Sequence, residues 1–216
     1  MRAVIFANGV LNNSQNIYEI ILPDDLIIAA DGGTTHCRTL GIKPSVVVGD
    51  LDSLNSDYLK SLQTSGTEII LYPVNKDQTD LELAIRKALD LGSDEIFVLG
   101  ALGARWDMTI ANLLLPAARE FSKVKIRLID GNQEIILLRG EGELIFKGKK
   151  GDILSLIPFG NDAYGVTLRG LEYPLEADVL KFGATRGISN VLIDDTATVY
   201  LKKGLLLCIH IHKNIL

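Results

Sequence analysis

Short apolar runs alternate with stretches of helical periodicity along the first 130 residues. This alternation is typical of a parallel sheet whose strands are joined by helices. A Rossmann-like α/β domain is therefore expected over residues 1–130. Its strands are predicted at Ala3–Phe6, Leu26–Ala30, Val46–Val48, Glu68–Leu71, Glu95–Leu99 and Lys125–Ile129.

Two of the predicted helices have clear signals. The first begins at Thr79, which forms a capping-box pattern with Glu82 ahead of an apolar stripe at helical spacing. The second is predicted from about Asp107 to Phe121, with a kink at Pro116. The side chains of the second helix expected to face inward are Ile110, Ala111, Leu114, Ala117, Ala118 and Phe121.

After about Asp130 the apolar runs are separated by Gly, Asn, Asp and Lys and by no convincing helix. Many short strands with turn residues between them predict an antiparallel β-sandwich over residues 131–216. The expected strands are Glu134–Leu138, Glu143–Phe146, Ile153–Pro158, Gly165–Arg169, Asn190–Asp194, Ala197–Leu201 and Leu205–Ile211.

Composition narrows the possible roles. Apolar residues make up 47% of the chain, enough for a folded core. The net charge of −5, without a run of Lys or Arg, argues against a nucleic-acid partner or an anionic membrane surface. Cys37 and Cys208 lack metal-ligand spacing and are expected to be buried free thiols. With no signal peptide or membrane-spanning run in the sequence, the cytoplasm is expected.

The segment Val46–Ser53 reads VVVGDLDS and places Asp50 and Asp52 directly after an apolar strand. Two carboxylates this close raise each other's cost of ionisation, so a bound cation such as Mg²⁺ would explain the pair. The alternative is an acidic turn that caps a helix starting near Asn55 or Ser56.

Polar residues and glycines follow the other predicted strands as well. The carboxyl ends of parallel strands lie at one edge of a sheet, where ligands bind. Each residue has a structural alternative, such as a tight turn or a helix cap, but together they predict a metal–nucleotide site. Neither GxxxxGK[ST] nor GxGxxG is present, so other residues must hold phosphates. Candidates for that role are the amides of Gly32 and Gly33 and the side chains of Lys76 and Arg105.

In these motifs the chain resembles the thiamine pyrophosphokinases, which transfer a pyrophosphoryl group from ATP to thiamine. The resemblance extends over essentially the whole chain. Two positions depart from the family pattern: Met108 stands where histidine is usual, and Ala104 replaces a glycine. The matching segments are AADGGTTH (29–36), GDLDS (49–53), KDQTDLELA (76–84), GALGARWDMTIANL (100–113) and RGISNV (186–191).

The resemblance implies roles for individual residues. Asp50, Asp52 and Asp80 would bind magnesium, with Asp77 as a possible further ligand. Those carboxylates and Arg105 would form the catalytic set. Ser189 and Asn190, which otherwise read as a polar turn before a strand, would contact thiamine. The residues beside ATP would be Asp31, Gly32, Gly33, Lys76, Thr79, Arg105 and Asp107.

The same resemblance implies a homodimer with thiamine pockets between subunits, and a reaction in which the thiamine hydroxyl attacks the β-phosphorus of ATP and AMP leaves. Either Asp77 or Asp80 could be the general base that accepts the proton of the thiamine hydroxyl. Three alternatives remain: a hydroxymethyl-pterin pyrophosphokinase, a phosphatase using Asp50 and Asp52 with metal ligands Asp194 and Asp195, and a non-enzymatic nucleotide-binding module.

The three histidines carry little signal in the sequence. His210 and His212 alternate in the last predicted strand, so their imidazoles share one face and could chelate a metal. A solvated strand face is the simpler interpretation, and no role is assigned to them or to His36.

Overall fold

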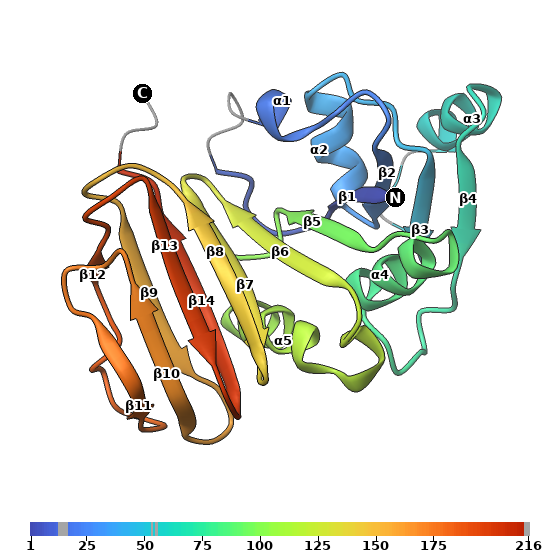
Figure 1. The fold of residues 1–216 in the computed structure, drawn as a ribbon. Coiled ribbons are helices and arrows are strands. Elements are labelled where there is room, and N and C mark those ends of the chain that lie inside the picture. Colours follow the sequence, from blue (N-terminus) through green and yellow to red (C-terminus); the bar gives the residue numbers. More distant parts are fainter. Residues whose placement is uncertain (13–16, 53, 55, 214–216) are drawn as a thin grey trace. The chain divides into compact units, whose positions relative to one another are not determined.

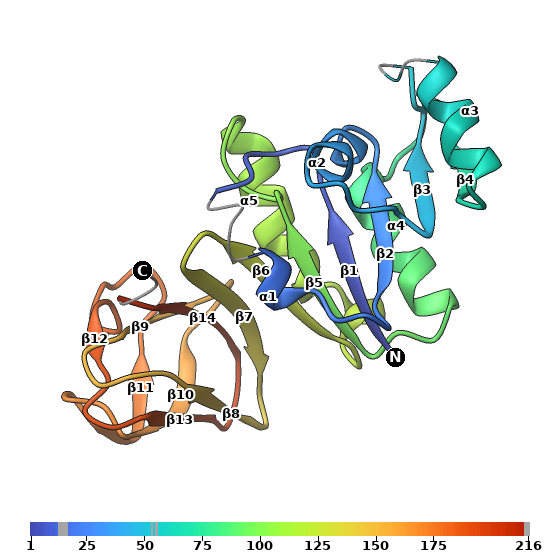
Figure 2. The ribbon, with the colours of Figure 1, turned by 90° about the horizontal axis from the view of Figure 1, so that it is seen from above.

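The computed structural model describes residues 1–12, 17–52, 54 and 56–213. The chain forms two compact units, Met1–Gly131 and Asn132–Leu216 (Figures 1 and 2). Within the described residues, no helix has both the length and the apolar character needed to cross a membrane.

The first unit contains a parallel sheet in the strand order β6-β5-β1-β2-β3-β4. The predicted strands are therefore confirmed, with ends that move by no more than one residue. The strand bounds are β1 (Arg2–Phe6), β2 (Leu26–Ala30), β3 (Val46–Gly49), β4 (Glu68–Leu71), β5 (Glu95–Leu99) and β6 (Lys125–Asp130).

Helices cover both faces of this sheet (Figure 1). On one face lie α1 (Ile17–Ile20), α2 (Gly33–Thr39) and α3 (Ser56–Thr64), and on the other lie α4 (Asp80–Asp90) and α5 (Trp106–Leu114). The capping prediction for α4 is confirmed, because the Thr79 hydroxyl oxygen accepts a hydrogen bond from the Glu82 N–H at 3.2 Å. The stripe Leu81, Ala84, Ile85 and Ala88 is buried as expected.

The second predicted helix is shorter than expected. It ends at Leu114, and two 3-10 turns follow, η2 (Leu115–Ala117) and η3 (Arg119–Phe121). Pro116, which lacks the N–H that a continuing helix needs, ends the helix instead of kinking it. The helix begins after Arg105, so Asp107 is in its first turn and is not its N-cap.

Of the side chains predicted to face inward, Phe121 is buried as expected, but two on α5 are exposed. Ile110 and Leu114 are 55% and 46% exposed, whereas the polar Asn112 is only 5% exposed. Asn112 can face inward because its side-chain amide donates a hydrogen bond to the Ala101 carbonyl at 2.6 Å. A polar side chain whose amide N–H is hydrogen-bonded therefore faces inward where the apolar pattern predicted Ile110.

The second unit is the expected β-sandwich. Its two antiparallel sheets have the orders β12-β9-β14-β7 and β11-β10-β13-β8. Leu138, Leu156 and Cys208 from the first sheet pack with Leu168 and Val199 from the second in one apolar core. The strands are β7 (Gln133–Arg139), β8 (Gly142–Lys147), β9 (Ile153–Pro158), β10 (Ala163–Arg169), β11 (Leu175–Leu180), β12 (Asn190–Val191), β13 (Thr196–Leu201) and β14 (Leu205–Ile211).

In this unit one predicted strand was too long, and one strand was not predicted. The run expected at Asn190–Asp194 forms a strand only over Asn190–Val191, and the exposed residues after Leu192 make a turn. Strand β11 was missed because it is an irregular edge strand with exposed Glu176 and Ala177 rather than an alternating apolar run.

Burial settles two further predictions. Cys37 and Cys208 are buried free thiols as expected, and burial raises the pKa of Cys37 to about 12. The solvated face predicted for the histidines of the last strand is wrong, because His210 is only 1% exposed. Leu206 and Cys208 on β14 belong to the core between the two sheets, and His210, on the same side of the strand, packs against Phe146 of the other sheet.

Candidate active site

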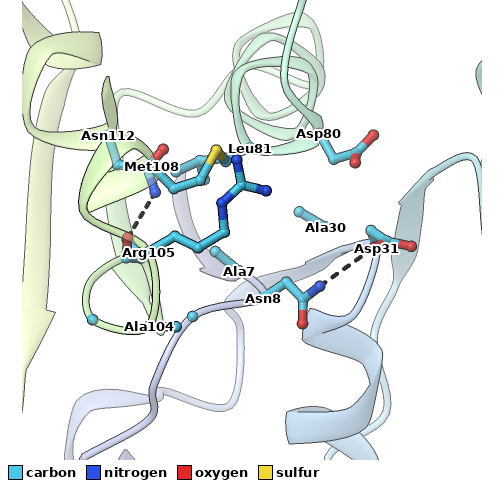
Figure 3. Close-up of a pocket in the computed structure, with 13 residues that line it drawn as sticks. Ala7, Asn8, Ala30, Asp31, Asp80, Leu81, Ala104, Arg105, Met108 and Asn112 are labelled. Carbon is cyan, nitrogen blue, oxygen red and sulfur yellow. Dashed lines mark hydrogen bonds between the residues drawn. The ribbon is translucent and has the colours of Figure 1, made fainter. Parts of the chain in front are cut away.

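A pocket lies at the carboxyl ends of β1, β2 and β5 in the first unit (Figure 3). The chain order runs from β1 through β2 to β4 on one side and places β5 and β6 on the other, so this is the topological switch point where α/β proteins bind ligands. The lining residues are Ala7, Asn8, Gly9, Ala30, Asp31, Asp80, Leu81, Ala101, Gly103, Ala104, Arg105, Met108 and Asn112.

Asp31 follows β2 with a positive φ of 45°, and its N–H donates a hydrogen bond to the Val48 carbonyl at 2.8 Å. Its Oδ2 lies 3.5 Å from the donating Asn8 amide, while its buried Oδ1 has no hydrogen-bond partner among the described residues. Burial raises the pKa of the Asp31 carboxyl, and the neighbouring charges of Asp80, Asp50 and Asp52 raise it further.

Asp80 opens α4 and lies on the same side of the pocket as Asp31 (Figure 3). Its Oδ1 is buried and accepts no hydrogen bond within the described part of the chain, although the Lys76 ammonium is 3.0 Å away. One buried carboxylate oxygen without a donor on Asp31 and one on Asp80 that meets only the Lys76 ammonium, in a field of like charges, have the chemistry of a divalent-cation site. The side chains present thus fit a magnesium ion.

Asp50 and Asp52 follow β3 and do not line the pocket, but their charges act on Asp31. Leu51 between them has a φ of 57° and is buried, whereas Asp50 is half-buried and Asp52 is exposed. The Asp52 N–H lies 3.4 Å from Asp50 Oδ1. Helix α3 begins at Ser56, while Ser53 and Asn55 of the predicted motif lie outside the described residues.

Arg105 reaches into the pocket from the loop after β5, on the side opposite Asp31 and Asp80 (Figure 3). Its Nε donates a hydrogen bond to Asp107 Oδ1 at 3.1 Å, and both side chains are largely exposed. The hydrogen bond and the opposite charge raise the pKa of Arg105 and lower the pKa of Asp107. Asp107 therefore contacts Arg105 and does not itself line the pocket.

Several predicted nucleotide-binding residues have a structural role. A Cβ on Gly33 would lie 2.0 Å from the Phe6 carbonyl oxygen, so glycine lets α2 begin against β1, and Gly32 similarly approaches the Asn8 side chain. The Thr79 hydroxyl caps α4, and Asp77 is exposed in the preceding loop.

The second unit has a pocket beside the RGISN segment. Asn190 is buried there, and its amide bonds both the N–H and the carbonyl of Tyr173, at 3.0 and 2.8 Å. Ser189 does not line the pocket; its N–H donates to Ser155 Oγ at 3.0 Å. The lining residues are Leu168, Glu172, Tyr173, Pro174, Leu175, Arg186, Gly187, Ile188 and Asn190.

Sequence reasoning did not assign a role to some pocket residues. Asn8 was visible as the polar end of β1, and Asn112 as a polar residue within an apolar helix. Asn112 Oδ1 is buried and has no hydrogen-bond partner among the described residues, so it can accept one from a ligand. Tyr173 precedes the strand that was missed and had no periodic pattern to mark it.

The fold and the pocket define a class of protein. A Rossmann-like unit with unsatisfied carboxylates facing a guanidinium at its switch point, in a chain that also carries a β-sandwich, is suited to an enzyme acting on a metal–nucleotide.

Comparison with known proteins identifies the family. The profile described as "Thiamin pyrophosphokinase, catalytic domain" matches residues 18–128, and "Thiamin pyrophosphokinase, vitamin B1 binding domain" matches residues 141–206. The chain belongs to the thiamine pyrophosphokinase family, whose members are ATP-dependent diphosphotransferases. The predicted family and fold class are confirmed, and these matches lend no support to the pterin, phosphatase or non-enzymatic alternatives.

Individual relatives agree with this assignment. "Thiamine pyrophosphokinase" of Bacillus subtilis (strain 168) is 34% identical over 184 residues, which cover 85% of this chain and 86% of that protein. The crystal structure of thiamine pyrophosphokinase from Bacillus subtilis has a TM-score of 0.87 at 31% identity and covers 99% of this chain and 100% of that one. The Geobacillus thermodenitrificans structure has a TM-score of 0.84 at 26% identity, covering 100% and 99%.

Proposed function

We propose that this chain transfers the diphosphate group of ATP to the hydroxyl of thiamine, giving thiamine diphosphate and AMP. The observation that carries the proposal is the pocket in which the buried carboxylate oxygens of Asp31 and Asp80 lie opposite the Arg105 guanidinium, with only the Lys76 ammonium near the Asp80 oxygen. Such a pocket offers a cation site and a phosphate-binding cation at the place where an α/β fold binds nucleotides. Membership of the family supplies the two substrates.

Asp50, Asp52 and Asp80 are proposed to bind the magnesium ion. Asp31 is proposed as a fourth carboxylate of the same site. The pKa of Asp31 is raised first by burial and then by the charges of Asp80, Asp50 and Asp52, and this closeness of like charges supports the assignment. Magnesium, when bound, would neutralise charge on the phosphate oxygens of ATP. Asp77 is exposed near the start of α4 and remains a candidate outer ligand.

The proposed reaction is an in-line displacement at the β-phosphorus. The thiamine hydroxyl oxygen forms a new bond to the β-phosphorus of ATP. The bond from this phosphorus to the oxygen that bridges it to the α-phosphorus breaks, and AMP leaves with the electron pair. Arg105 is proposed to stabilise charge on the phosphates, with Asp107 holding its guanidinium at the pocket mouth. Lys76 can exchange its contact with Asp80 for a phosphate. Asp77 or Asp80 accepts the hydroxyl proton.

Thiamine is proposed to bind in the pocket of the second unit. That pocket offers Tyr173 and Ile188 as apolar surface, with Arg186 and Asn190 as polar groups. Asn190 contributes by holding the backbone of Tyr173 in place. Ser189, which does not line the pocket, keeps a proposed thiamine-side role only through its backbone position.

A homodimer with thiamine pockets at the subunit interface is part of the proposal. Trp106, Ile110 and Leu114 are spaced four residues apart on α5 and are 81%, 55% and 46% exposed. An apolar stripe of this kind on a helix is suited to burial against another chain.

One assay tests reaction class and acceptor together. The protein is incubated with ATP, Mg²⁺ and thiamine, and the products are separated by chromatography. Thiamine-dependent AMP with thiamine diphosphate is the expected result, and omission of thiamine or addition of a chelator is the control. ADP would indicate attack at the γ-phosphorus, and phosphate released without thiamine would indicate a phosphatase. AMP formed only with a hydroxymethyl pterin would contradict the assignment of thiamine as the acceptor.

A further inference from the structure

A second cluster of metal-ligating side chains lies in the β-sandwich, outside the lining of both pockets. Glu134 on β7 and His210 on β14 are directly paired across the sheet, and His212 follows at the end of β14. One ligand atom from each of these side chains lies within 4.8 Å of the other two. Glu134 is far from the two histidines in sequence, and the pairing of β7 with β14 brings them together.

His210 is the central member of the cluster and is 1% exposed. Neither of its ring nitrogens has a hydrogen-bond partner among the described residues. The Phe146 ring packs edge-on against it with centroids 5.7 Å apart, and the His212 ring lies at 4.0 Å. Apart from Asp152 Oδ2, which lies 3.4 Å from Nε2, the buried imidazole has no polar partner among the described residues. Such burial is costly, so a bound group that accepts its lone pair would remove an unfavourable feature of the fold.

Asp152 lies beside both imidazoles. Its Oδ2 is 3.4 Å from His210 Nε2 and 3.3 Å from His212 Nδ1. The backbone N–H groups of Lys149 and Lys213 donate to its two oxygens at 2.9 and 3.0 Å, which fixes the orientation of the carboxylate. A carboxylate held in this way is the usual second-shell partner of metal-binding histidines, because it orients the rings.

The backbone beside the cluster leaves space for its side chains. A Cβ on Gly148 would lie 2.6 Å from Asp152 Oδ2 and 2.9 Å from His210 Nε2. Glycine is therefore required where the chain passes the cluster.

Charge also favours a cation here. Burial, assisted by His212, lowers the pKa of His210 to about 4, so its ring is neutral at pH 7 and has a free lone pair. Burial alone would raise the pKa of Asp152, but the backbone donors of Lys149 and Lys213, with smaller contributions from His212 and His210, lower it overall. The neutral imidazole of His210 offers a lone pair next to the Asp152 carboxylate, and this pair of groups is suited to a cation rather than to an anion.

We propose that Glu134, His210 and His212 bind one Zn²⁺ ion, with Asp152 orienting the imidazoles. Two imidazoles and one carboxylate suit zinc, whereas Mg²⁺ and Ca²⁺ take oxygen ligands. Zinc–ligand bonds of about 2.0–2.1 Å in a tetrahedral site require the three ligand atoms to move to a separation of about 3.3 Å when the ion binds. The ion would join the end of β14 to β7, and it would stabilise the sandwich rather than take part in phosphoryl transfer.

The first test uses the unmodified protein. The chain has three histidines, so a histidine-labelled sample gives few side-chain NMR signals, and His36 in the other unit is an internal control. Addition of one equivalent of Zn²⁺ in excess Mg²⁺ should shift the ring signals of His210 and His212 and leave those of His36 unchanged. Unmoved signals of His210 and His212 would overturn the proposal without any variant.

The second test measures affinity with Co²⁺ as a spectroscopic probe, again in excess Mg²⁺. Wild type should bind one equivalent with visible d–d absorption, and Zn²⁺ should displace it. Glu134→Gln and His212→Ala should each weaken binding at least about tenfold, since even loss of a second-shell group costs that much. Glu143→Gln, at an exposed position on β8, is the matched control and should bind as wild type does.

Circular dichroism of each variant checks that it is folded before its affinity is compared. Equal Co²⁺ affinity in wild type, Glu134→Gln and His212→Ala would place the ion elsewhere and reject the site. Zinc should also raise the thermal midpoint of wild type more than that of Glu134→Gln, because an ion that binds only the folded state stabilises it. Neither readout depends on the proposed catalytic activity, so the two proposals can fail separately.

Discussion

Individual residues with strained backbone mark the candidate sites. Among the described residues, Asp31, Leu51, Ala104, Ala177 and Ser189 are the non-glycine positions with positive φ. Four of these five lie in loops that the sequence assigned to function, and Ala177 lies in an irregular edge strand. A strained residue persists only where its surroundings hold it, which is why such positions gather at binding sites.

Asp31→Asn should separate the stability of the protein from its activity. Because the folded-state pKa of Asp31 is raised, its ionised form opposes folding, and the free energy of unfolding falls as pH rises through that pKa. Asparagine also tolerates positive φ, so the variant should have a higher thermal midpoint without metal at pH 7 and a flatter pH dependence. Its kcat should fall at least about a hundredfold.

Thermal unfolding across pH and steady-state turnover provide both measurements. Asp90→Asn, at the exposed end of α4, is the control and should change the free energy of unfolding by less than about 0.5 kcal/mol with normal turnover. If Asp31→Asn turned over like wild type, Asp31 would have no part in the metal–nucleotide site.

At the scale of elements, the start of α4 links stability to the site. Thr79 caps the helix, and the next residue, Asp80, then lies in the pocket. Helix α4 packs against β1, β2 and β3, so its position sets the distance between Asp80 and the loop that carries Asp31. A change at the cap should therefore affect both folding and nucleotide binding.

Thr79→Ala should lower the free energy of unfolding by about 1 kcal/mol, the usual cost of losing a side-chain N-cap. Urea denaturation measures it. Thr39→Ala at the exposed end of α2 removes a hydroxyl that bonds only the Thr35 carbonyl within its own helix, and it should change stability by less than about 0.5 kcal/mol. Equal losses in the two variants would mean that the cap has no special contribution.

At the scale of the whole molecule, the exposed stripe of α5 bears on assembly. The described chain has Trp106 at 81% exposure next to the pocket residue Arg105. A second subunit that covered this stripe would also contact or restrain the loop that carries Arg105, because Arg105 directly precedes Trp106. Assembly and catalysis are thus expected to depend on each other.

The double variant Trp106→Ser, Ile110→Ser should sediment as a monomer at concentrations where wild type is a dimer, because it removes the largest exposed apolar side chains of α5. Sedimentation equilibrium measures the mass. Leu91→Ser, 41% exposed after α4, should leave the mass unchanged. A wild-type monomer, or a double variant that stays dimeric, would contradict the assignment of this face.

The sequence by itself determined the strands of the parallel sheet, the cap at Thr79 and the burial of both cysteines. These features depend on local periodicity and on the side chain's own chemistry, which are readable without knowing any partner. It also placed Asp31, Asp80 and Arg105 at one edge of the sheet, because parallel strands bring their carboxyl ends together.

Only the tertiary structure decided what each side chain meets. Asn112 faces inward because the Ala101 carbonyl accepts its hydrogen bond, and Lys76 contacts Asp80 instead of standing free. His210 is buried because its side of β14 packs against the other sheet, where it meets Phe146. Contacts between residues distant in sequence set burial, ion pairing and helix rotation, and periodicity within one segment does not contain that information.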